Sequence, residues 1–103
     1  MALPTLSPEQ RQAALETARQ ARAARSALLA GLKAGTVTLA DVLARDDDIA
    51  RRTSVAQVVR ALPGVGPARA AAAMERAGII LDRRVGGLGA RQREQLLAEF
   101  AGR

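Results

Sequence analysis

The sequence predicts an all-α protein, and three observations lead to that fold class. Alanine accounts for 24 of the 103 residues, and arginine and leucine, the next most frequent, also favour helices. Phe100 is the only aromatic residue, so the side chains typical of β-strands are scarce. Capping residues also precede apolar runs of helical periodicity. Because alanine buries little area, we expect one modest core.

The first expected element is a long helix that begins after Ser7 and ends at about Leu32. Ser7 is suited to be its N-cap, Pro8 its first helical residue and Gln10 the partner in a capping box. Steps of three and four residues place a stripe of mostly small side chains on one face. We therefore expect weak docking and fraying at the N-terminal end. The stripe consists of Ala14, Thr17, Ala21, Ala24 and Leu28.

A short second helix is expected after Thr38, and it carries Leu39, Val42 and Leu43. It stops at the acidic run Asp46–Asp48. Three adjacent carboxylates raise the alternative of a metal site. The spaced acids, glycine and distal glutamate of a calcium loop are missing, so we interpret the run as a solvated loop and predict no metal.

Three further helices are expected in the second half. Ser54 and Gln57 form a capping-box pattern before an apolar helix. A break at 63–67 separates it from a helix that Pro67 opens and that runs through Ala77. A longer glycine- and arginine-rich connection leads to a last helix from about residue 90. Apolar positions in the first and last of these helices are Val55, Val58, Val59, Leu62, Leu96, Leu97 and Phe100.

This order of elements predicts a helix-two-turns-helix layout over residues 54–101. We divide the chain into residues 1–37, the long helix with its flanks, and residues 38–103, a small helical domain that contains the layout. The length of the chain leaves no room for a second core of comparable size.

The composition excludes several function classes. Cysteine and histidine are absent, which removes disulfides, thiolate nucleophiles, the commonest metal ligand and the usual general base. We therefore predict a non-enzymatic protein without cofactors. No apolar run reaches the roughly 20 residues of a membrane span, and the first residues lack the basic-then-apolar order of a signal peptide. The expected location is cytoplasmic, without a membrane partner.

The net charge of +6 lies entirely in the second half of the chain. Residues 1–50 hold six Lys/Arg and six Asp/Glu, whereas residues 51–103 hold ten arginines and four Asp/Glu. Lys33 is the only lysine, and guanidinium is the better bidentate partner for phosphate. A genome-wide bias toward arginine codons explains the excess of arginine over lysine, but it does not explain the asymmetry between the halves.

The two turns supply the chemistry for a polyanionic partner. At 64–66 the missing glycine side chains let the backbone approach a ligand, and the next helix N-terminus favours an anion. The second turn places Arg83 and Arg84 beside three glycines, which suits a phosphate ribbon or a narrow minor groove. One glycine turn has a purely structural explanation, but two on a basic half-chain predict nucleic-acid contact. The predicted contact residues are Gly64, Val65, Gly66, Arg69, Arg83, Arg84, Gly87, Gly89 and Arg91.

Four arginines of the long helix form a further basic group. They lie within roughly one third of the helix circumference at 100° per residue. This group is either an ordinary solvated face or a secondary nucleic-acid contact. Its members are Arg11, Arg19, Arg22 and Arg25.

A set of motifs spans nearly the whole chain. It comprises Leu3-Pro4, Leu6, Ser7–Arg11, Leu62–Gly66, Arg69, Met74–Arg76, Gly78-Ile79, Arg83–Val85 and Gly87–Gly89. This set resembles the actinobacterial integration host factor family. The resemblance implies a single-chain helical protein with a ribosomal S13-like helix-two-turns-helix module that binds duplex DNA in the nucleoid and supports phage integration.

The resemblance also implies which residues contact the DNA backbone, namely residues 64–66, Arg69, Arg83 and Arg84. Pro67 and Gly86 depart from the family pattern, which commonly has a basic residue at each position. A divergent paralogue or a phage-related member is consistent with this difference. The implied partners are double-stranded DNA and recombinase or integrase complexes, and the implied state is a monomer.

The resulting hypothesis is a largely sequence-tolerant protein that binds duplex DNA through phosphates and alters its shape. No helix looks like a recognition helix rich in Asn, Gln and Arg side chains aimed at base edges. One alternative is an RNA-binding or ribosome-associated module with the same two turns. Another is a helical interaction protein that docks a partner on its N-terminal helix. A glycosylase-type repair enzyme does not fit, because Ala2 rather than proline follows Met1.

Overall fold

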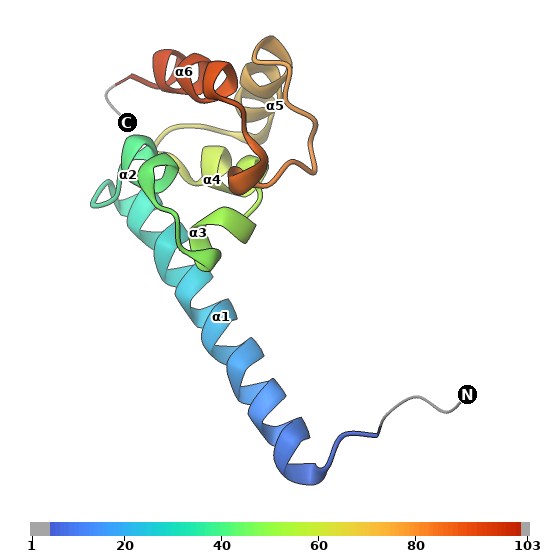
Figure 1. Cartoon of the computed structure of the whole chain (residues 1–103). Coiled ribbons are helices and arrows are strands. Elements are labelled where there is room, and N and C mark those ends of the chain that lie inside the picture. The colour runs from blue at the N-terminus through green and yellow to red at the C-terminus, as the bar shows by residue number, and fades with distance from the viewer. Residues whose placement is uncertain (1–4, 102–103) are drawn as a thin grey trace.

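The computed structural model describes residues 5–101, and its helices confirm the all-α prediction (Figure 1). A long first helix is followed by five shorter α-helices and one 3₁₀ helix within that range. The elements are α1 (Pro8–Ala34), α2 (Leu39–Ala44), α3 (Asp48–Arg52), α4 (Val55–Ala61), α5 (Pro67–Arg76), η1 (Val85–Gly87) and α6 (Ala90–Glu99).

Helix α1 begins with the expected capping box. The Ser7 hydroxyl accepts a bond from the Gln10 N–H at 3.1 Å, and the Gln10 side chain accepts one from the Ser7 N–H at 2.9 Å. The helix ends at Ala34, two residues beyond the predicted end, because Gly35 adopts a φ of 80° and closes the last turn. Glycine is favoured at this position because a Cβ disfavours the left-handed region.

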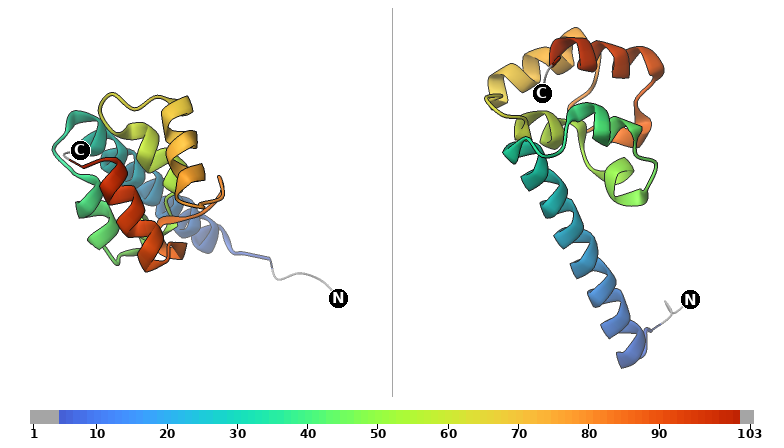
Figure 2. Two further views of the ribbon diagram at one scale, coloured as in Figure 1. Left: turned by 90° about the horizontal axis from the view of Figure 1, so that it is seen from above. Right: turned by 90° about the vertical axis from the view of Figure 1, so that its left-hand side faces the viewer.

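Only the C-terminal part of α1 packs against the other helices. Leu28 and Leu32 are buried, whereas Ala14 and Thr17 of the predicted stripe are exposed. The N-terminal turns project away from α2–α6 in every view (Figures 1 and 2). The expectation of weak docking at this end is therefore confirmed. Leu15, with 54% of its surface exposed, lies on this projecting part.

The connection between α1 and α4 contains one helix more than predicted. Thr38 caps α2 through a full capping box with Asp41, as the sequence indicates. The interpretation of Asp46–Asp48 as a solvated loop is confirmed for Asp46 and Asp47, which are exposed and lie outside the helices. It is wrong for Asp48, the first residue of the short helix α3, which Asp47 caps by accepting a bond from the Ala50 N–H. Five residues are too few to show a hydrophobic period, so this helix had no pattern to reveal it.

Helix α4 begins with half of the predicted capping box. The Ser54 hydroxyl accepts from the Gln57 N–H at 3.1 Å, but the reciprocal bond is not formed. An isolated antiparallel bridge also pairs Ser54 with Arg84, and its backbone bonds come from the flanking residues, Val55 N–H to the Arg83 carbonyl and Val85 N–H to the Thr53 carbonyl.

One core joins α1 to the rest of the protein. It lies between the last turns of α1 and α2–α6, so residues from both sides of the predicted boundary at 37 contribute. The division into 1–37 and 38–103 stays a prediction. The largest fully buried side chains are Leu32, Leu39, Met74, Leu96, Val42, Val55, Val58, Val59, Val85 and Thr53.

Candidate functional site

A cavity of about 650 Å³ opens where α1, α3 and η1 meet. Four of its lining side chains are arginines, and they come from three separate elements. Two aspartates and two glycines complete the lining. The residues are Arg25, Arg51, Arg52, Arg84, Asp46, Asp48, Gly86 and Gly87.

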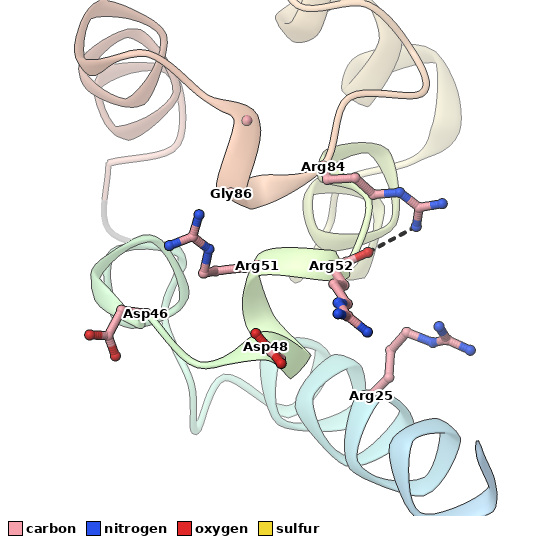
Figure 3. Close-up of a pocket in the computed structure, with 8 residues that line it drawn as sticks. Arg25, Asp46, Asp48, Arg51, Arg52, Arg84 and Gly86 are labelled. Carbon is pink, nitrogen blue, oxygen red and sulfur yellow. Dashed lines mark hydrogen bonds between the residues drawn. The ribbon is translucent and has the colours of Figure 1, made fainter. Parts of the chain in front are cut away.

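Three of these arginines, Arg25, Arg52 and Arg84, form what we call the arginine trio. Their guanidinium groups extend to one side of α3 (Figure 3). Arg84 donates from Nη1 to the main-chain carbonyl of Arg52 at 2.9 Å. None of the three forms an ion pair with a residue of the described range, although two aspartates line the same cavity. Like charges held together without carboxylate partners favour an anion.

The position of Arg84 is fixed by the backbone on both sides of it. The Arg83 carbonyl accepts from the Val55 N–H at 2.9 Å, and the Val85 N–H donates to the Thr53 carbonyl at 3.0 Å. These two bonds join the second turn to the segment between α3 and α4. Arg52 and Arg84 therefore lie close together although 32 residues separate them in sequence.

Most backbone donors of the second turn are used within the protein. Over residues 85–89, only Gly86 has an N–H without a hydrogen-bond partner in the described range. The backbone of residues 85–89 therefore offers an anion at most one donor, and the side chains of the turn carry most of the chemistry. The internal acceptors are Thr53 O for Val85, Arg84 O for Gly87, Val85 O for Leu88 and Gln92 Oε1 for Gly89.

Arg93 of α6 holds the second turn in place. Its guanidinium donates to the carbonyl oxygens of Leu43 at 2.6 Å, Val85 at 3.3 Å and Leu88 at 3.4 Å. It thereby links α6, α2 and η1 without a carboxylate. From the sequence alone, Arg93 is indistinguishable from the exposed Arg91 near the start of the same helix.

Arg83 lies apart from the trio. Its Cδ is 3.1 Å from the point where a Cβ on Gly87 would lie, so its stem packs against that glycine. Its Nε is buried without a hydrogen-bond partner in the described range. The structure thus separates the two adjacent arginines that the sequence pairs, since only Arg84 lines the cavity.

The first turn, residues 62–66, does not line this cavity. Gly64 has a φ of 75°, which requires glycine, and Val65 is buried with its N–H donated to the Leu62 carbonyl at 3.1 Å. Gly66 is exposed and precedes α5 without a side-chain cap, so the first N–H groups of α5 have no intrahelical partner. The two predicted turns are therefore separate features of the surface.

The predicted residues near α5 and α6 occupy different surroundings. The guanidinium carbon of Arg69 lies 5.7 Å from the centre of the Phe100 ring, within the range of a cation–π contact. Arg91 is exposed at the start of α6, and the Gly89 N–H is already bonded to Gln92. A nearby ion pair between Arg76 and Glu99 joins α5 to α6 and raises the pKa of Arg76.

Of the four arginines predicted on α1, only Arg25 reaches the cavity. Arg19 pairs with Glu16 at 3.1 Å, and Arg11 donates to the Leu6 carbonyl at 3.4 Å. Arg22 is exposed. Proximity to α3 therefore distinguishes Arg25 from the other three.

A third ion pair uses the charges of two further side chains. Arg45 donates to Asp47 at 2.7 and 2.9 Å, and this bond lowers the pKa of Asp47 to about 2. Both side chains are thereby committed to each other and to the start of α3. Neither lines the arginine cavity.

Sequence reasoning missed Arg51 and Arg52 as site residues. Their only signal was membership of the basic second half of the chain. They approach Arg84 through the bridge at Ser54, and no local pattern predicts that pairing.

The part of the chain that the structure describes has no helix with the length and hydropathy to cross a membrane.

Comparison with known proteins identifies the family and the fold of this chain. Residues 32–100 match the S13-like H2TH domain. The integration host factor of Streptomyces coelicolor is 44% identical over 102 residues, covering 97% of this chain and 95% of that protein. The chain belongs to the actinobacterial integration host factor family. The integration host factor of Mycobacterium tuberculosis is 45% identical over 102 residues, which cover 97% of this chain and 97% of that protein.

A solved structure gives the family a direct spatial comparison. The structure of sIHF bound to an 8 bp palindromic DNA superposes with a TM-score of 0.80 at 38% identity, covering 84% of this chain and 99% of that chain. The predicted resemblance to the integration host factor family is thus confirmed in both sequence and fold. The chain in that comparison structure is bound to duplex DNA. The cationic surface of the present protein is therefore the feature to compare with it.

Proposed function

We propose that this integration host factor family member is a non-enzymatic nucleoid protein that binds duplex DNA, with the arginine trio as its main phosphate contact. The observation that carries the proposal is the meeting of Arg25, Arg52 and Arg84 without a carboxylate partner in the described range. Placing three cations together is unfavourable unless an anion neutralises them. A run of phosphodiesters supplies such an anion at regular spacing.

The chemistry of the side chains favours phosphates over base edges. Guanidinium groups form bidentate bonds with phosphate oxygens, and the cavity brings three of them together on one side of α3. Binding of this kind is largely independent of sequence. It depends on salt, because each neutralised phosphate releases condensed counterions.

The first turn and its neighbours form the second part of the proposed surface. The uncapped N-terminus of α5 offers backbone donors near Gly64 and Gly66, and Arg69 lies on the first turn of that helix. Val65 contributes only through its main chain, because its side chain is buried. The remaining predicted contacts are Arg83, Gly87, Gly89 and Arg91, with Arg11, Arg19 and Arg22 as secondary positions.

Contacts at two separate turns suit a protein that changes the shape of DNA. When a duplex touches both turns and Arg25 of α1, the added phosphate contacts offset the free energy that bending the DNA costs. We accordingly propose that the protein has an architectural role on DNA. Its association with recombinase complexes and its monomeric state stay predictions.

Fluorescence anisotropy with labelled 20-base-pair duplexes tests the phosphate contacts. Neutralisation of about four to six phosphates gives a slope of log K against log salt of roughly −4 to −5. Arg84→Ala should weaken binding about tenfold and make the slope about 0.9 less negative. Arg60→Ala, which removes the same charge from a residue outside the cavity, is the matched control.

Three outcomes would contradict the proposal. Retained binding with a salt slope near zero would remove the electrostatic explanation. Structured RNA that displaces the duplex in competition would favour the alternative of an RNA-binding or ribosome-associated module. Equal effects of Arg84→Ala and Arg60→Ala would mean that overall charge, rather than the trio, governs affinity.

A further inference from the structure

Gly86 is a glycine whose backbone conformation does not require one. Within the described residues the glycines with positive φ are Gly35, Gly64 and Gly78, and Gly86 lies in the 3₁₀ helix η1 with an ordinary φ. Any residue can adopt that conformation. The reason for glycine at this position must therefore lie in the space around it.

That space is filled by Arg51 of α3. A Cβ on Gly86 would lie 3.1 Å from Arg51 Cβ, 3.1 Å from Arg51 Nε and 3.2 Å from Arg51 O. Both the base of the arginine and its guanidinium end thus lie against the glycine. Packing along the whole side chain restricts its rotamers before any ligand arrives.

The charge of Arg51 is not used within the protein. Its guanidinium forms no hydrogen bond or ion pair with a residue of the described range, although Asp46 and Asp48 line the same cavity. Figure 3 shows the guanidinium on the other side of α3 from those of the trio, with the Asp46 carboxylate directed away from Arg51. An ordered cation without a partner is suited to bind an anion with little further loss of entropy.

We propose that Gly86 is kept small so that Arg51 can lie across the second turn, where Arg51 binds a DNA phosphate outside the reach of the arginine trio. The inference rests on the proposed DNA-binding function and extends it to the opposite side of α3. Arg51 is the phosphate ligand, and Gly86 is a positioning residue that acts through it.

A double-mutant cycle in the full chain tests both roles by anisotropy over a range of salt concentrations. Arg51→Met keeps the length of the stem and removes the charge. It should weaken duplex binding about tenfold and reduce the steepness of the salt slope by about 0.9. Gly86→Ala should cause a similar loss by displacing Arg51, and the double variant should be no weaker than the weaker single variant.

Three controls keep the outcome interpretable. Thermal unfolding by circular dichroism reports whether each variant is folded, and Arg51→Lys should recover part of the affinity because it retains a cation. Arg60→Ala reports the effect of lost charge alone. Additive losses in the cycle, or an Arg51→Met variant with wild-type affinity and slope, would overturn the inference. Absence of duplex binding by the wild-type protein would instead overturn the proposed function.

Discussion

Replacement of Arg93 by methionine should destabilise the protein far more than the same change at Arg91. Methionine keeps a similar stem but cannot donate to the carbonyls of Leu43, Val85 and Leu88. Hydrogen bonds from charged groups contribute about 1.5–3 kcal/mol, and only the bond to Leu43, at 2.6 Å, is short. If each longer bond contributes a few tenths of a kcal/mol, we expect the free energy of unfolding to fall by about 2–3 kcal/mol.

That loss is a large share of the stability of a small domain. Globular proteins unfold with roughly 5–15 kcal/mol, and 1 kcal/mol moves the Tm of a domain of this size by about 4–8 °C. Circular dichroism at 222 nm should therefore show a Tm about 8–24 °C lower for Arg93→Met. Arg91→Met, at an exposed position on the same helix, should change the free energy of unfolding by less than about 0.5 kcal/mol.

Equal shifts for the two variants would refute the role assigned to Arg93. A second measurement separates positioning from direct DNA contact. Because Arg93 is turned inward, Arg93→Met at a temperature where it is folded should weaken duplex binding without changing the salt slope. A slope reduced by about 0.9 would place Arg93 on a phosphate instead.

Three further changes test the local structure. Gly31→Ala should lower stability by about 1–3 kcal/mol, measured by urea unfolding, because the new Cβ would lie 2.7 Å from Val37 Cγ2. Gly64→Ala should cost about 1–2 kcal/mol in the same assay, because it forces a Cβ into a φ of 75°. The bond from Arg45 lowers the pKa of Asp47 from 3.8 to about 2, so its contribution to stability is nearly complete above about pH 5 and is lost as the pH falls through the folded pKa. Asp47→Asn should remove that part of the pH dependence of urea unfolding.

Matched positions provide the controls for these changes. Gly66→Ala should be nearly neutral for stability, since nothing lies within 4 Å of its Cβ position and its φ is −87°. Asp46→Asn should leave the acid limb of the stability curve unchanged, because Asp46 forms no ion pair in the described range. A loss of stability in Gly66→Ala as large as that expected for Gly31→Ala would contradict the local explanations. So would loss of the acid limb of the stability curve in Asp46→Asn.

The sequence predicts elements that depend on neighbouring residues. The caps at Ser7 and Thr38 each bond to a residue three positions later, and Pro67 fixes its own φ at the start of α5. Helix α3 is different, because its five residues bury only Ala50 and owe their stability to Asp47 and to contact with η1. The sequence carries no periodic signal for a helix of this length.

The candidate site was predictable only in part for the same reason. Charge asymmetry indicates the basic half, and glycines indicate two turns, but neither states which arginines meet. The bridge between Ser54 and Arg84 brings Arg52 to the second turn, and the contact at Gly86 brings Arg51. Those are long-range pairings, as is the inward direction of Arg93. The predicted contact residues themselves stay a prediction until binding is measured.

The uneven packing of α1 has a consequence for amide hydrogen exchange. Its first turns open without disturbing any other helix, whereas Leu28 and Leu32 are released only when the core itself unfolds. Exchange rates should therefore fall steeply along one continuous helix, from near the rate of an isolated peptide at Arg11 to the global unfolding limit at Leu32. DNA that contacts Arg25 would move this gradient toward the N-terminus.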